Sequence, residues 1–156
     1  MARISIYTDG SSRGNPGPGG FGVVMVSGDH KREISEGFRY TTNNRMELLS
    51  VIVGLEQLKG DGHQVLVVSD SKYVVDSVEK KWVFGWQKKG FKGKKNMDLW
   101  ICFLRIYPKN DVKFQWVKGH AGHPMNERCD ELAVEAATGS KLKQDAAFEV
   151  ENGCKP

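Results

Sequence analysis

Four acidic residues lie where a strand-like or helix-like stretch of the sequence meets a loop. They are Asp9, Glu47, Asp70 and Asp130. Carboxylate oxygens are the ligands that Mg²⁺ and Mn²⁺ prefer, so a set of them gathered in one pocket would hold divalent cations. Each acid also has an ordinary explanation as a turn former, a helix cap or a first-turn acid that suits the helix dipole. Taken singly, the acids leave both interpretations open.

A lysine-rich segment from Lys80 to Met97 is a second candidate for function. It contains seven lysines and no acid, so it contributes +7 to a net charge of +4 and leaves −3 for the remainder. Aromatic residues are interleaved with these lysines: Trp82, Phe84, Trp86 and Phe91. Such a surface can stack on bases or sugars and pair with phosphates, which favours nucleic-acid contact. The alternative is that the aromatic rings simply pack beneath a solvated charged face.

The elements that must position these residues follow from hydrophobic periodicity. Strands are expected over 3–8, 21–26 and 34–40 as an antiparallel meander, and over 64–69 and 112–117. Helices are expected over 43–59, 71–78, 82–88, 97–107 and 126–137. The stretch 10–20 holds five glycines and two prolines, which predicts a shaped loop. The pattern predicts one α/β domain over 1–138, with a mixed sheet and helices on both faces, and a loosely ordered polar tail over 139–156.

Length and composition limit the class of protein. The chain has 156 residues, 27% of them charged and 39% hydrophobic, which suits one globular domain. No apolar run approaches the roughly 20 residues of a membrane helix, and the N-terminus begins a strand pattern instead of a signal peptide. We therefore expect no membrane association and a cytoplasmic location, with a monomer as the default. The cysteines, Cys102, Cys129 and Cys154, suggest neither a disulfide framework nor a Cys-x-x-Cys metal site.

Five sequence strings, read in order, resemble ribonuclease H of the type 1, bacterial kind. The resemblance extends from about Ile4 to Ala137, and five motifs in the right order make it specific. The strings are Tyr7-Thr8-Asp9-Gly10-Ser11, Gly14-Asn15-Pro16-Gly17-Pro18-Gly19-Gly20, Thr41-Thr42-Asn43-Asn44-Arg45-Met46-Glu47-Leu48, Ser69-Asp70-Ser71-Lys72-Tyr73-Val74, and Trp116 to His123 continuing through Glu127 to Ala133. This resemblance implies a ribonuclease H-like fold, with a five-stranded mixed sheet of three antiparallel strands followed by two parallel ones.

The resemblance also implies which residues carry the chemistry. The four acids would converge and hold two Mg²⁺ ions, with Mn²⁺ as a possible substitute: Asp9 would bridge both ions, and Asp130 would help to hold the one on the nucleophile side. The expected reaction is hydrolysis of the RNA strand of an RNA–DNA hybrid, leaving 5′-phosphate and 3′-hydroxyl ends. His120 matches a mobile catalytic histidine that can move a proton. Its alternatives are a surface histidine or a zinc ligand with His123 and Cys129, for which a fourth ligand is missing.

Substrate contacts are implied at three places. The loop after Asp9 and the start of the 43–59 helix would contact the RNA strand, which is distinguished by its 2′-hydroxyl groups. The DNA strand would be held through phosphate contacts from Asn15 and Thr42 and through the basic aromatic segment. The residues concerned are Gly10, Ser11, Ser12, Asn15, Thr42, Asn43, Asn44, Lys72, Trp82, Trp86, Lys88 and Lys89. The basic segment, Gln87 to Asn96, is shorter than in well-known bacterial members of the family. Lys72 stands at a position where such members carry an uncharged side chain.

Two other functions remain open. A catalytically silent module that binds hybrids or double-stranded RNA would keep the basic segment but could dispense with the acids, all of which are present. A metal nuclease on the same fold could instead cut DNA, although the asparagine pair Asn43-Asn44 and the glycine-rich loop favour RNA.

Overall fold

One mixed sheet organises the molecule, which is described here by a computed structural model covering residues 3–119 and 122–151. Its strands are β1 (Arg3–Ser12), β2 (Gly17–Ser27), β3 (His30–Thr41), β4 (Gln64–Ser69), β5 (Asp111–Trp116) and β6 (Leu142–Lys143). They lie in the order β5-β4-β1-β2-β3-β6. Strands β1, β2 and β3 are antiparallel, whereas β4 pairs parallel with β1, and β5 with β4. The predicted mixed α/β fold is confirmed, but the described residues form six strands where we expected five.

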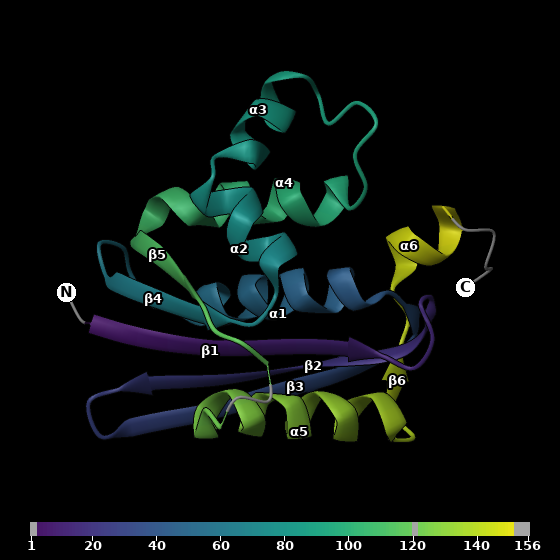
Figure 1. Cartoon of the computed structure of the whole chain (residues 1–156), viewed down its shortest axis with the longest axis horizontal. Coiled ribbons are helices and arrows are strands. Elements are labelled where there is room, and N and C mark those ends of the chain that lie inside the picture. The colour runs from purple at the N-terminus through teal and green to yellow at the C-terminus, as the bar shows by residue number, and fades with distance from the viewer. Residues whose placement is uncertain (1–2, 120–121, 152–156) are drawn as a thin grey trace.

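Helices cover both faces of this sheet (Figure 1). Helix α1 (Asn43–Glu56) packs on one face, and α5 (Pro124–Thr138) lies along the other. Beyond α1 lie α2 (Lys72–Glu79), α3 (Trp82–Lys88) and α4 (Met97–Ile106), followed by a short 3₁₀ helix (Tyr107–Lys109) and, at the C-terminal end, α6 (Ala146–Glu151). The main core lies between α1, α4 and the sheet, where side chains such as Ile6, Val51 and Trp100 are fully buried. None of the described helices is long and apolar enough to span a bilayer.

The expected loop over 10–20 is mostly strand, and this part of the prediction is wrong. Strand β1 continues to Ser12 and β2 begins at Gly17, so the turn between them is short. The glycines serve close packing instead: a Cβ atom on Gly20 or Gly22 would lie 2.5 or 2.3 Å from carbonyl oxygens of α5. A Cβ on Gly10 would lie 2.4 Å from the backbone nitrogen of Glu47. Periodicity along one segment cannot reveal that a distant helix approaches so closely.

The segment after α5 is also more ordered than expected. Strand β6 pairs parallel with β3, and α6 follows it. Asp145 and Glu149 are buried here in ion pairs with Arg45 and Arg39. Polar composition suggested a loose tail, but these acids have long-range partners that composition does not reveal. The proposed domain boundary at residue 138 stays a prediction.

Candidate active site

Two neighbouring parallel strands bring Asp9 and Asp70 together. In their register Thr8 of β1 lies opposite Ser69 of β4, and the residue that follows each of them in the chain is an aspartate. Asp9 lies within β1, and its Oδ1 accepts a hydrogen bond of 2.9 Å from the Gly10 backbone N–H. Asp70 follows the last residue of β4. Parallel pairing therefore places the two aspartates side by side, where β4 ends next to β1.

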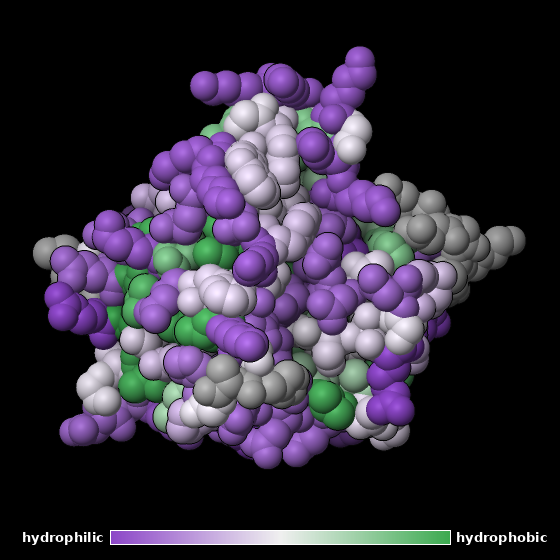
Figure 2. Space-filling view, in the orientation of Figure 1, coloured by the Kyte–Doolittle hydropathy of each residue, from purple (hydrophilic) through white to green (hydrophobic). Residues whose placement is uncertain are grey.

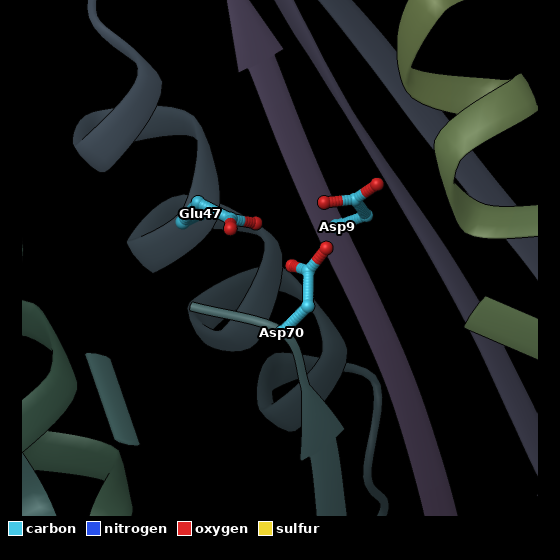
Figure 3. A group of neighbouring side chains, drawn as sticks. All are labelled: Asp9, Glu47 and Asp70. Atoms are coloured by element: carbon cyan, nitrogen blue, oxygen red, sulfur yellow. The ribbon is translucent and has the colours of Figure 1, made fainter. Parts of the chain in front are cut away.

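Glu47 reaches the same place from α1. The absent Cβ of Gly10 lets β1 approach the backbone of this helix at Glu47. Figure 3 shows the carboxylates of Asp9, Glu47 and Asp70 directed toward one another from three different elements. Carboxylate oxygens of these three residues lie within 4.8 Å of each other. The predicted convergence of these acids is thus seen in the structure.

Burial and mutual repulsion make this cluster costly without a cation. Asp9 and Glu47 are each only 5% exposed. Burial, followed by the charges of Asp70 and Asp130, raises the pKa of Asp9 to about 8. Burial and the charges of Asp9 and Asp70 likewise raise the pKa of Glu47 well above its usual value. A divalent cation would offset both costs by neutralising the charge.

The donor set fits a hard divalent metal. Every ligand is a carboxylate oxygen, which suits Mg²⁺ or Mn²⁺ better than zinc. Two buried oxygens, Glu47 Oε1 and Asp70 Oδ1, have no hydrogen-bond partner among the described residues. Buried polar atoms are normally satisfied, so this pair is in keeping with a site that a cation completes.

Asp130 lies beside this triad and faces the same hollow. It is half-buried on α5 and, with the three other acids, lines a cavity of about 440 Å³. Its charge contributes to the raised pKa of Asp9. It is not a member of the tight three-residue group. Asp130 is therefore close enough to act on the cluster electrostatically from the opposite face of the sheet.

The residues near the acids that are predicted to contact either strand of the hybrid divide between this cavity and its surroundings. Those that line the cavity are Gly10, Ser11, Asn43, Asn44 and Lys72. Ser12 ends β1 and is absent from this lining, while Asn15 and Thr42 line a separate cavity together with Asn44. The roles of all these residues in binding remain predictions.

The basic aromatic segment combines both of its interpretations. Phe91 is buried, and the Trp86 ring packs edge-on against Trp100 at a centroid distance of 6.1 Å. Trp82 is 47% exposed, and both Lys88 and Lys89 are exposed. Figure 2 shows hydrophilic side chains projecting over α3 and the loop that follows it. In this segment some aromatic rings pack inside the protein, while the lysine side chains are exposed and accessible to a ligand.

The structure does not test the predicted role of His120, but it bears on the alternative of a zinc site. His120 lies outside the described residues. Cys129 is fully buried against Val24 and Leu132, and burial raises the pKa of its thiol, which disfavours the thiolate that zinc requires. Within 3–119 and 122–151, the group of side chains able to hold a metal is the acid triad.

Trp116 is a neighbour of the site whose role the sequence did not suggest. Its Nε1–H donates a hydrogen bond of 3.0 Å to the backbone carbonyl oxygen of Asp70. The Lys72 ammonium group lies 4.7 Å from the centre of the Trp116 ring. The Trp116 side chain thus contacts both the backbone of Asp70 and the ammonium group of Lys72. Its place in the fifth motif was a signal, but the motif alone does not show what the indole contacts.

The mixed sheet, with carboxylates gathered where β4 ends beside β1, places the protein in the class of enzymes with a ribonuclease H-like fold. A family model described as RNase H matches residues 1–138, and the chain belongs to the ribonuclease H family. The prediction that the chain belongs to this family is confirmed, and so is the prediction that it is an enzyme.

Known relatives agree with this assignment over most of their lengths. Ribonuclease H of Desulforamulus reducens is 53% identical over 150 residues, covering 93% of this chain and 94% of the relative. Ribonuclease H of Aeromonas hydrophila is 48% identical over 154 residues, covering 96% and 99%. Among solved structures, LC9-RNase H1, a type 1 RNase H with the type 2 active-site motif, superposes with a TM-score of 0.80 at 34% identity, covering 97% of this chain and 81% of that one. LC11-RNase H1 in complex with an RNA/DNA hybrid gives 0.60 at 27% identity, covering 86% and 96%.

Proposed function

We propose that this protein hydrolyses the RNA strand of RNA–DNA hybrids and leaves 5′-phosphate and 3′-hydroxyl ends. The observation that carries this proposal is the convergence of the Asp9, Glu47 and Asp70 carboxylates within 4.8 Å, in a protein of the ribonuclease H family. The solved complex of LC11-RNase H1 with an RNA/DNA hybrid supports the choice of substrate.

Asp9, Glu47, Asp70 and Asp130 would hold two Mg²⁺ ions. When bound, the ions would supply activation of a water molecule and charge stabilisation at the leaving 3′ oxygen. The chain's own contribution is to fix the four carboxylates on four packed elements, β1, α1, the end of β4 and α5, before substrate arrives, so that little reorganisation is needed at reaction. His120 would accept or deliver a proton near neutral pH.

The neighbouring polar groups would orient the hybrid. Asn43 and Asn44, at the start of α1, present amides at the cavity wall, where they can contact the sugar edge of the RNA strand. Asn15 and Thr42 would hold a phosphate of the DNA strand. We further propose that the protein acts as a monomer in the cytoplasm and that residues 1–138 form the catalytic domain.

The proposal is tested by incubating the protein and Mg²⁺ with a labelled RNA–DNA hybrid, duplex RNA or duplex DNA. We expect cleavage of the RNA strand of the hybrid alone, with 5′-phosphate ends identified by mass. Hybrid binding without cleavage in Mg²⁺ or Mn²⁺ would instead support a silent binding module. Cleavage of duplex DNA would support a DNA nuclease on the same fold.

A further inference from the structure

A second polar cavity lies beside the carboxylate site and has parts with no assigned role. It has a volume of about 260 Å³, and its lining includes Asn15, Thr42 and Asn44. Lys95 and Asn96 from the loop before α4 complete it, with Phe148 of α6. Its polar side chains are amides, a hydroxyl and an ammonium group, and none of the described residues that line it is acidic. This chemistry suits a phosphodiester group of a nucleic-acid backbone.

Asn96 joins this cavity to the carboxylate site. Its backbone is left-handed, with a φ of 64°, a conformation that asparagine tolerates better than most residues. Its Nδ2 donates a hydrogen bond of 3.1 Å to the Tyr73 hydroxyl, and Tyr73 lines the carboxylate cavity. Its Oδ1 accepts a bond of 3.3 Å from the guanidinium group of Arg45. Asn96 is therefore held from two sides, by α2 and by α1.

Arg45 is in turn held by the C-terminal segment. Its side chain is 2% exposed, and its Nε and one terminal nitrogen donate bonds of 2.8 and 3.0 Å to Asp145. The same guanidinium contacts Asp98 of α4 at 2.7 and 2.9 Å. Asp145 also accepts a hydrogen bond of 2.7 Å from Thr41, the last residue of β3. A buried guanidinium that loses one of two carboxylates keeps unpaired donors, so Asp145 matters for where Arg45 points.

We propose that Asp145 is a positioning residue for substrate binding, acting through Arg45 and Asn96. It keeps the loop that carries Lys95 at a fixed distance from the carboxylates, so that a phosphate of the DNA strand seated in the second cavity aligns the RNA strand for cleavage. The proposal rests on the proposed function, since it names how that site holds its substrate. It also gives the C-terminal segment a role in binding beyond that of covering the sheet edge.

The test compares Asp145→Asn with Glu36→Gln as a matched control. Glu36 pairs with Lys143 at 2.7 Å, so the control also breaks an ion pair of the C-terminal segment, but one that does not touch Arg45. Affinity for a short fluorescent hybrid is measured by anisotropy in EDTA over a range of salt concentrations. KM and kcat are measured in Mg²⁺ at 25 °C, after circular dichroism confirms that each variant is folded.

We expect Asp145→Asn to raise Kd and KM about tenfold with kcat within twofold, and to reduce the salt slope by about one unit, as for one lost phosphate contact. Lys95→Ala should do the same, and the double variant should be no worse than either single one. Glu36→Gln should bind as the wild type does. Asn96→Gly, which keeps the left-handed backbone but removes both hydrogen bonds, should reproduce the effect if Asp145→Asn does not fold.

Two results would overturn the inference. One is an Asp145→Asn variant with a lowered melting temperature but unchanged Kd and salt slope, which would mean a structural role alone. The other is a fall in kcat with unchanged Kd and KM, which would mean that the carboxylates moved instead. A wild type that binds the hybrid but does not cleave it would refute the proposed function, while the binding comparison would still decide the role of Asp145.

Discussion

Replacing Asp9 by asparagine should stabilise the metal-free protein at neutral pH. In the folded protein, burial and then the charges of Asp70 and Asp130 raise the pKa of Asp9 from 3.8 to about 8. Between these values the unfolded chain has released the proton while the folded chain still retains it. The contribution of Asp9 to stability is therefore lost progressively as the pH rises from about 4 to about 8.

The size of the effect follows from this shift. Each pH unit above the unfolded pKa of 3.8 costs about 1.4 kcal/mol of stability while the folded carboxyl stays protonated. At pH 7 this cost amounts to about 4 kcal/mol. Asparagine keeps the shape of the side chain but cannot ionise, so it removes this cost. We expect a gain of about 2 to 4 kcal/mol in EDTA at pH 7. For a chain of this length, that raises the melting temperature by roughly 5 to 15 °C.

The assay is thermal unfolding followed by circular dichroism at pH 4 and pH 7, with EDTA or with Mg²⁺. The gain should nearly vanish at pH 4, where wild-type Asp9 carries little charge cost. Mg²⁺ should raise the melting temperature of the wild type more than that of Asp9→Asn, because the variant lacks a ligand. Asp61→Asn, in an exposed turn, is the control and should show neither effect. A variant that is less stable than the wild type at pH 7, or a gain equal at both pH values, would refute the reasoning.

Three further predictions concern turnover, binding and packing. Asp70→Asn should abolish turnover but leave hybrid binding in EDTA largely intact, and comparable rates for variant and wild type would remove Asp70 from the mechanism. Replacing Lys88 and Lys89 by alanine should weaken hybrid binding and reduce its salt slope by about one unit per lost phosphate contact, whereas an unchanged slope would mean that both lysines only face water. Gly22→Ala should lower the free energy of unfolding by about 1 to 3 kcal/mol, because the new Cβ would lie 2.3 Å from a carbonyl oxygen of α5. Gly85→Ala, in α3 with no atom within 4 Å of the new Cβ, should be neutral or slightly stabilising in the same denaturant titration.

Local patterns predicted most of the elements because those patterns reflect contacts within one segment. The alternation of Ile4 and Ile6 and the apolar run of β4 correspond to strands in the structure, and the apolar positions of 43–59 correspond to a buried helix that ends at Glu56. The errors arose where a distant element decides the outcome. The glycines of β2 fit the backbone of α5, and Asp145 fits the guanidinium of Arg45, 100 residues away. Neither match is visible in a window of neighbouring residues.

The site shows the same division. Periodicity placed Asp9 and Asp70 near the ends of strands, but the convergence of the acids came from the resemblance to a family, because no local pattern encodes which strands are neighbours. Trp116 was present in a recognised motif, yet its hydrogen bond to Asp70 depends on β5 lying beside β4. A sequence states which groups are available, and the sheet order decides which of them meet.

The structure also resolves the choice that the acids left open when taken singly. Asp9 lies within a continuous strand, so it forms no turn. The N-cap of α1 is Thr42, whose hydroxyl accepts a hydrogen bond of 3.2 Å from the Arg45 N–H, and this leaves Glu47 without a capping role. Ser71, and not Asp70, caps α2 by accepting a bond of 3.2 Å from Val74.

Asp130 completes this argument on the other face of the sheet. It lies beyond the first turn of α5, which begins at Pro124, so a favourable interaction with the helix dipole does not explain it. Other residues therefore perform the local tasks that could have accounted for the acids. What remains is a group of carboxylates that line a common cavity and include buried side chains whose burial costs folding free energy. Two of them, Glu47 and Asp70, each have a buried oxygen with no hydrogen-bond partner among the described residues. The destabilisation caused by these acids is not offset by any cap or turn that they form. A cation-binding site explains it, because the same repulsion that destabilises the empty cluster strengthens its attraction for Mg²⁺.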